Sequence, residues 1–241
     1  MQRRPGEVWF LPPQAHEGGD DKPRRHVLLT SCQEEEGGVL AYASTKPTEA
    51  VFGAAFLAID PAVSPRSGFS RPTRIYPARL VLAASEDFLR MTGRLDGELP
   101  QLRSVVRAAL GIGTGTVLPD GSTGRPSWRG KVVWLGSVAR DAIGYTFAVV
   151  LTEHRYSTHC RYQLVVPVEN RALTDPLEDD LVVTERDWLQ VLNMDSAGAI
   201  LGVAEVQSLF HRDEIEAWTG AVIDDRTLDE LEAALGTLFE F

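Results

Sequence analysis

The sequence contains an internal repeat, and this feature constrains its fold more than any other. Written one under the other, the two halves share an order of short motifs at offsets that run from 121 to 129 residues. Each half begins with an apolar run after a glycine, Gly6 in the first half and Gly130 in the second. Each closes on a Thr-Gly pair, at 92–93 and at 219–220. We therefore expect two copies of one small domain.

The apolar pattern within each half predicts strands first and a helix last. Short apolar and β-branched runs bounded by turn residues are typical of strands. They cover 7–11, 26–31, 38–44, 56–59 and 79–83 in the first half, and 131–135, 147–152, 162–168 and 180–183 in the second. Apolar residues then recur three or four positions apart over 99–110 and 228–238, as in an amphipathic helix. We predict an α+β fold of two similar small antiparallel β-barrel domains, each ending in a helix.

The segment between the halves is rich in Gly, Ser, Thr and Pro, which favours a loop over a helix or strand. We expect an N-terminal domain over 1–114, a linker over 115–127 and a C-terminal domain over 128–241. A self-complementary interface can be kept when two copies are fused, because each copy carries the same patch. The two domains are therefore expected to form a pseudo-dimer, and the chain to be a monomer that imitates a homodimer.

Charge is divided unevenly between the halves. The whole chain carries −10, but residues 1–130 hold 16 Lys or Arg and 14 Asp or Glu, whereas 131–241 hold 8 and 20. The first half is thus +2 and the second −12. This asymmetry fits either a solvated acidic surface on the second half or an anionic ligand on the first.

Composition limits the location of the protein and its cofactors. The longest apolar stretch, over 50–59, has ten residues, and about 20 are needed to span a membrane. The first residues contain no apolar signal core, so a cytoplasmic protein without membrane contact is expected. Cys32 and Cys160 are too isolated for a disulfide framework or a zinc site, and no metal or other cofactor is expected.

Five segments in order resemble the MazF/PemK toxin domain, whose barrel is shared with CcdB. The first strand of that family is matched by 4–10, and its Arg-initiated second strand by 24–31. Its third strand ends in a Thr-containing turn, and residues 40–46 are similar to that strand end. The entry to its last helix is similar to residues 93–95, and the end of that helix is similar to residues 110–111. The resemblance covers nearly all of the chain because this order occurs twice.

The resemblance implies a metal-independent endoribonuclease without a cofactor. In such an enzyme the 2′-hydroxyl of single-stranded RNA is the nucleophile, and a cyclic phosphate is left. Arg25 falls on the family's catalytic arginine, and Ser44, with Thr45 beside it, on the catalytic threonine. His26 departs from the family, which has proline there, and Ser44 departs from its threonine. An antitoxin-like protein partner is implied as well.

The chemistry of these residues suits the implied reaction. A guanidinium offers a planar fork of donors to phosphate oxygens, so Arg25 is expected to clamp the phosphate. Ser44 or Thr45 can donate one hydroxyl hydrogen bond to it. Two plainer interpretations stay open: Arg25 as a surface arginine in a cluster with Lys22 and Arg24, and 44–45 as an ordinary turn at a strand end.

A second group of residues is predicted to bind RNA outside the catalytic pair. The segment 66–79 interleaves arginines with aromatic residues, a composition suited to phosphate contact and base stacking, although a plain basic loop has the same composition. The RNA-binding candidates are Arg24, Lys46, Arg71, Arg74 and Tyr76.

The second half lacks the corresponding site residues. By sequence, Thr146 takes the place of Arg25 and Glu169 the place of Ser44, so the second copy is expected to be inactive. Three function classes compete: an RNase toxin with one site in the N-terminal copy, an inactive module that binds nucleic acid or protein, and a CcdB-like inhibitor of another protein.

Overall fold

The computed structural model divides into two compact units, residues 1–109 with residue 241 and residues 110–240. It describes residues 2–13, 22–46, 56–113, 128–153, 162–169, 180–184, 186–193, 198–209 and 214–241. The expected linker 115–127 lies outside these residues.

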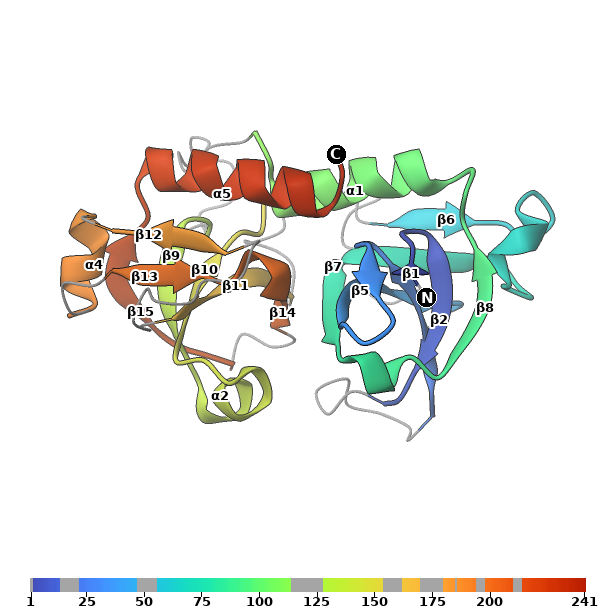
Figure 1. Cartoon of the computed structure of the whole chain (residues 1–241), viewed down its shortest axis with the longest axis horizontal. Coiled ribbons are helices and arrows are strands. Elements are labelled where there is room, and N and C mark those ends of the chain that lie inside the picture. The colour runs from blue at the N-terminus through green and yellow to red at the C-terminus, as the bar shows by residue number, and fades with distance from the viewer. Residues whose placement is uncertain are drawn as a thin grey trace. The chain divides into compact units, whose positions relative to one another are not determined.

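The first unit is built around a six-stranded sheet in which every strand pair is antiparallel (Figure 1). The strand order is β6-β7-β5-β3-β2-β8. Their bounds are β2 Glu7–Leu11, β3 Arg24–Leu28, β5 Gly38–Ser44, β6 Leu57–Ile59, β7 Thr73–Ala83 and β8 Arg90–Arg94. The long β7 pairs with all of β5, with a bulge between Ala41 and Tyr42.

Shorter elements complete the first unit. They are the paired strands β1 Gln2–Arg3 and β4 Cys32–Gln33, the 3₁₀ turns η1 Pro65–Ser67 and η2 Ser85–Asp87, and the helix α1 Leu99–Leu110. The buried positions of α1 include Leu102, Val106 and Leu110, which recur at the spacing of one helix face.

The second unit has a sheet in the order β12-β13-β11-β10-β9-β15, with β14 also paired to β11. Its strands are β9 Lys131–Leu135, β10 Phe147–Val150, β11 Gln163–Glu169, β12 Leu181–Val183, β13 Ala199–Leu201, β14 Gln207–Leu209 and β15 Ile215–Val222. Its helical elements are α2 Ser137–Ile143, α4 Asp187–Val191, η3 Val203–Glu205 and α5 Asp225–Leu238.

The two sheets have the same connectivity when their strands are matched in chain order. β9, β10, β11 and β12 take the places of β2, β3, β5 and β6, and β15 takes that of β8. β13 and β14 together pair with β11 as the single strand β7 pairs with β5. The turn η3 separates β13 from β14, whereas β7 is continuous.

Individual hydrogen bonds recur at matching positions of the two units. Gly6 and Gly130 both have positive φ, and their amides donate to Leu28 O and Val150 O, at 2.8 Å each. The Thr92 hydroxyl donates to the carbonyl of Val8 in β2, and the Thr219 hydroxyl donates to the carbonyl of Val132 in β9. Thr30 and Thr152 likewise accept from the amides of the third strand, those of Val39 and Leu164. The same bonds therefore frame both sheets.

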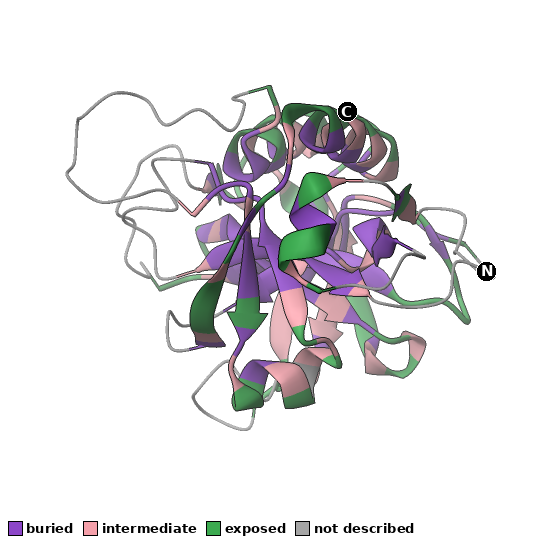
Figure 2. Cartoon of the chain, turned by 90° about the vertical axis from the view of Figure 1, so that its left-hand side faces the viewer, coloured by how far each residue is buried: buried purple, intermediate pink, exposed green. Residues whose placement is uncertain are grey.

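The core of each unit lies on its strands. Figure 2 colours most of the strand residues as buried, and the helices are buried on one side. In the second unit one cluster of buried residues joins β9, β10 and β11 to α2 and β14; it consists of Val133, Leu135, Ala139, Ala148, Val150, Val165 and Leu209. Burying apolar side chains of this size contributes about 1.5–3 kcal/mol each.

The mixed fold with antiparallel sheets and the helices over 99–110 and 225–238 confirm the predicted elements. Sequence patterning missed the strands β1, β4, β8, β13, β14 and β15 and the helices α2 and α4. The residues of β8 are polar or half-exposed, so this strand carries no apolar signal.

A close backbone contact fixes η1 against β8. A Cβ added at Gly93 would lie 2.3 Å from the carbonyl carbon of Ser67, and one added at Gly68 would lie 2.1 Å from Thr92 O. Gly68 also has φ +72°, a conformation that favours glycine. Only hydrogen fits at these two positions, so the segment after η1 is held directly on β8.

We predict that Gly93→Ala destabilises the protein by about 1–3 kcal/mol, the usual cost of forcing an extra group into a packed site. The measurement is urea-induced unfolding followed by circular dichroism. Gly97→Ala is the matched control, because an added Cβ there meets nothing within 4 Å, and a change below about 0.5 kcal/mol is expected. Equal stability of both variants would contradict the contact.

Candidate functional site

Arg25 stands at the start of β3, and its guanidinium packs against two aromatic rings. The guanidinium carbon lies 4.8 Å from the ring centre of Phe10 and 5.9 Å from that of Phe69. Phe10 is the cross-strand partner of Arg25 on β2, and Phe69 follows the glycine that holds η1 on β8. Arg90, from β8, approaches the same Phe10 ring at 5.3 Å. We call these four residues the Arg25 stack.

Neither arginine of the stack has a counter-ion in the described part of the chain. No hydrogen bond or ion pair is recorded for the guanidinium of Arg25 or Arg90 among these residues, and the Arg25 Nε atom is buried without a partner. Cation–π contacts orient a guanidinium but leave its N–H donors unused. Two cations on one ring with unused donors are suited to an anion that accepts hydrogen bonds.

Strand alternation separates Arg25 from Ser44. His26 pairs with Tyr42, and their rings touch at 5.5 Å, so these side chains share a face. Successive side chains of a strand point to opposite faces. Ser44 therefore lies on the face of Tyr42 and His26, and Arg25 lies on the other. Thr45 is exposed in the bend that follows the strand.

His26 is fully buried, with Nδ1 3.2 Å from the carbonyl oxygen of Arg24. It therefore packs against Tyr42 and faces away from Arg25, as expected from its place next to Arg25 on the strand.

A second group of predicted residues meets where β5 ends beside β7. Ser44 pairs with Arg74, and its hydroxyl accepts from the amide of Lys46 at 3.1 Å. The hydroxyl of Tyr76 donates to the Lys46 carbonyl at 3.4 Å, and the Arg74 guanidinium lies 4.7 Å from the Phe56 ring centre. The structure thus brings Ser44, Lys46, Arg74 and Tyr76 together.

The other two RNA-binding candidates are Arg24 and Arg71. Arg24 is half-buried at the first position of β3, and Arg71 is exposed before β7, where its carbonyl accepts from Thr73. Sequence reasoning missed Phe10 and Arg90. Their signal was weak, since Phe10 fits an ordinary apolar strand and Arg90 belongs to a strand that the pattern did not predict.

The second unit has different side chains at the place of the stack. Trp134 pairs with Phe147 as Phe10 pairs with Arg25, and the two rings are 4.4 Å apart. Phe147, and not Thr146, therefore occupies the arginine's position. The sequence alignment was wrong by one residue here, because an apolar run looks alike in either register. Glu169 ends β11 as Ser44 ends β5.

Among the described residues, no group of three or more His, Cys, Asp or Glu is placed to hold a metal ion. No helix in the described ranges is both long and apolar enough to cross a membrane.

Comparison with solved structures finds likenesses that span one half of the chain. An endoribonuclease in complex with its cognate antitoxin, from a mycobacterial species, is 17% identical with a TM-score of 0.36, over 48% of this chain and 96% of that one. MazF from Deinococcus radiodurans is 22% identical with a TM-score of 0.37, over 48% and 98%. Each of these likenesses spans about half of this chain and nearly all of the other protein.

MazF in a MazE–MazF structure from Deinococcus radiodurans is spanned completely, at 21% identity and a TM-score of 0.35, by 50% of this chain. No family model and no curated protein matches the sequence.

Proposed function

We propose that the first unit binds single-stranded RNA and cuts it at one site, with Arg25 as the phosphate clamp. The observation that carries this proposal is the Arg25 guanidinium, which two rings orient and no described acceptor occupies. RNA offers both chemical groups that this surface can use, since phosphate oxygens accept from arginine and bases stack on aromatic rings.

In the proposed reaction the 2′-hydroxyl loses its proton to water and its oxygen attacks the adjacent phosphorus, and the bond from phosphorus to the 5′-oxygen breaks as that oxygen takes a proton from water. The products are a 2′,3′-cyclic phosphate and a 5′-hydroxyl, so the protein need supply no nucleophile and no metal. Negative charge grows on the non-bridging oxygens as phosphorus becomes five-coordinate. A guanidinium held in place beforehand stabilises this charge without reorganising. Arg90 adds a second positive charge at the same ring.

A hydroxyl donor completes the proposed clamp. We propose Thr45 rather than Ser44 for this role because Thr45 is exposed after the strand, whereas the Ser44 hydroxyl already accepts a hydrogen bond and lies on the face opposite Arg25. Arg24, Lys46, Arg71, Arg74 and Tyr76 are proposed to contact RNA away from the cleavage point.

We also propose that the chain arose by tandem duplication and that its second copy is inactive. The shared strand order and the recurring Gly and Thr hydrogen bonds support this origin. Phe147 offers no donor where Arg25 stands, and the Glu169 carboxylate would repel phosphate. The proposed domains are 1–114 and 128–241, paired as the two copies of a homodimer would pair, and we place their action in the cytoplasm.

The second candidate function is an inactive module that binds nucleic acid or a protein. The opposite faces of Arg25 and Ser44 favour it, because a binding surface does not require these two groups to converge. An antitoxin-like partner is proposed on the sequence resemblance alone.

We expect Arg25→Ala to slow RNA cleavage by roughly 10²–10³-fold, as losing one transition-state donor costs about 3–4 kcal/mol. The assay follows a long RNA by gel electrophoresis in EDTA. Arg107→Ala, which removes an exposed arginine from α1, is the control and should cut as fast as wild type. If wild type binds RNA without cutting it, the second candidate function holds; if Arg25→Ala cuts as fast as wild type, the clamp is misassigned.

Thr45→Ala is expected to reduce the cleavage rate more than Ser44→Ala does, in the same assay. The reason is that Thr45 is exposed in the bend after β5, whereas Ser44 lies on the face opposite Arg25. A larger loss in Ser44→Ala would show that Ser44, and not Thr45, meets the phosphate.

The proposed pseudo-dimer predicts a monomer in solution. Sedimentation equilibrium should give a mass of 26.5 kDa for the full chain. A mass of twice that value at micromolar concentration would refute the prediction.

A further inference from the structure

A cavity of about 270 Å³ opens in the first unit between η1 and the turn that joins β8 to α1. Its polar lining comes from Ser64, Arg66, Ser67, Arg94, Asp96 and Glu98. Pockets for drug-sized ligands run from about 300 to 1,000 Å³, so this one suits a smaller group, of the size of a single base.

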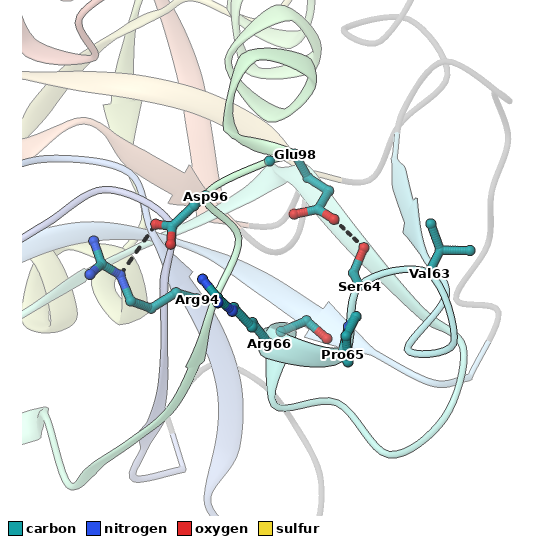
Figure 3. Close-up of a pocket in the computed structure, with 9 residues that line it drawn as sticks. Val63, Ser64, Pro65, Arg66, Arg94, Asp96 and Glu98 are labelled. Carbon is teal, nitrogen blue, oxygen red and sulfur yellow. Dashed lines mark hydrogen bonds and ion pairs between the residues drawn. The ribbon is translucent and has the colours of Figure 1, made fainter.

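The polar groups of the cavity are partly used and partly free. The Arg94 Nε atom pairs with Asp96 Oδ1 at 3.3 Å, and the Ser64 hydroxyl donates to Glu98 Oε1 (Figure 3). No partner is recorded for Asp96 Oδ2, for Glu98 Oε2 or for the Arg66 guanidinium among the described residues. The site therefore presents free acceptors and a free donor fork together.

This combination disfavours a phosphate group. Two carboxylates in a small cavity repel an anion, and one of the two arginines is already paired with Asp96. A neutral ligand with N–H donors on one side and acceptors on another uses all the free groups. In Figure 3 the carboxylates of Asp96 and Glu98 are drawn above Arg66, so the acceptors and the donor fork come from different parts of the cavity lining.

Guanine has this distribution of groups. Its O6 and N7 accept from an arginine fork, and its N1–H and N2–H₂ groups are neighbouring donors suited to a carboxylate. Adenine presents an amino group beside N7, so it offers the fork one acceptor in place of two. Cytosine and uracil lack N7, so they cannot accept two hydrogen bonds from one guanidinium at one edge while they donate hydrogen bonds from another edge.

Two chain segments that line the cavity also carry residues of the Arg25 stack. Ser67 lines the cavity, and Phe69, two residues further on, stacks on Arg25. In the second segment, Arg94 at the end of β8 lines the cavity, and Arg90 at the start of β8 lies over the Phe10 ring. Two residues span at most about 7 Å, so one RNA strand can reach both places.

We propose that this cavity is a guanine subsite of the RNA-binding surface, with Glu98 and Asp96 accepting from the Watson–Crick edge and Arg66 donating to O6 and N7. This inference rests on the proposed function, because it requires that the first unit bind RNA. It adds a preference for a guanosine near the phosphate that Arg25 contacts.

The test uses the full chain and fluorescein-labelled nonamers of 2′-O-methyluridine, which lack the nucleophile and stay intact. One central position carries the 2′-O-methyl form of guanosine, adenosine, cytidine, inosine or 7-deazaguanosine, and binding is measured by fluorescence anisotropy. We expect the guanosine oligomer to bind about tenfold more tightly than the adenosine one, within the range of one good base contact. Inosine, without N2–H₂, and 7-deazaguanosine, without N7, should each lose part of this preference.

Two variants assign the preference to the cavity. Glu98→Gln should abolish the guanosine-over-adenosine ratio while leaving the affinity for the adenosine oligomer unchanged. Arg66→Ala, which removes an exposed side chain, should erase the difference between guanosine and 7-deazaguanosine. Glu86→Gln is the matched control, since Glu86 is an exposed carboxylate that also accepts from a serine, outside the cavity; it should behave as wild type.

The outcomes separate the two proposals. Tight binding of all oligomers with equal affinity overturns the guanine subsite and leaves RNA binding standing. A guanosine preference that survives in both Glu98→Gln and Arg66→Ala overturns the assignment to this cavity. Failure of every oligomer to bind overturns the proposed function itself, and the subsite with it.

Discussion

The organisation of the first unit depends on one backbone contact, that of Ser67 and Gly68 with Thr92 and Gly93. Without side chains at the two glycines, the segment after η1 reaches β8 directly. Phe69 is thereby brought over Arg25, and the same contact closes one end of the cavity between η1 and the start of α1. Arg25 and Arg90 are thus positioned by packing and cation–π contacts, without ion pairs among the described residues, which leaves their guanidinium donors available.

The second unit shows that the hydrogen bonds that hold the sheet can be kept while the side chains at the candidate site differ. Gly130, Thr152 and Thr219 make the hydrogen bonds that Gly6, Thr30 and Thr92 make in the first unit. These bonds satisfy backbone groups that would be costly to bury unpaired. The side chain at the position of Arg25 does not have to satisfy a buried backbone group. One sheet can therefore have an arginine over a phenylalanine there, while the other has two aromatic rings at the matching positions.

The sequence was sufficient to predict the elements that carry a strong apolar pattern. Strands such as Gly38–Ser44 and the helix Leu99–Leu110 can be predicted from the spacing of the apolar residues that they bury. β8 could not be predicted, because its polar residues pair through the backbone alone. Arg25 was visible as a basic residue before an apolar run, whereas Phe69 reaches it only through tertiary structure. Register was the other gap: a slip of one residue in an apolar run moved the equivalent of Arg25 from Phe147 to Thr146.

The difference between Arg25 and Phe147 at matching strand positions has a consequence for how this molecule can change. In an assembly of identical subunits every substitution appears in each subunit, so a damaged site has no intact counterpart. Here the two positions are encoded by different codons, and a change in one leaves the other untouched. The strand pair that holds Trp134 and Phe147 is therefore free to acquire properties of its own, while the pair that holds Phe10 and Arg25 keeps its charge.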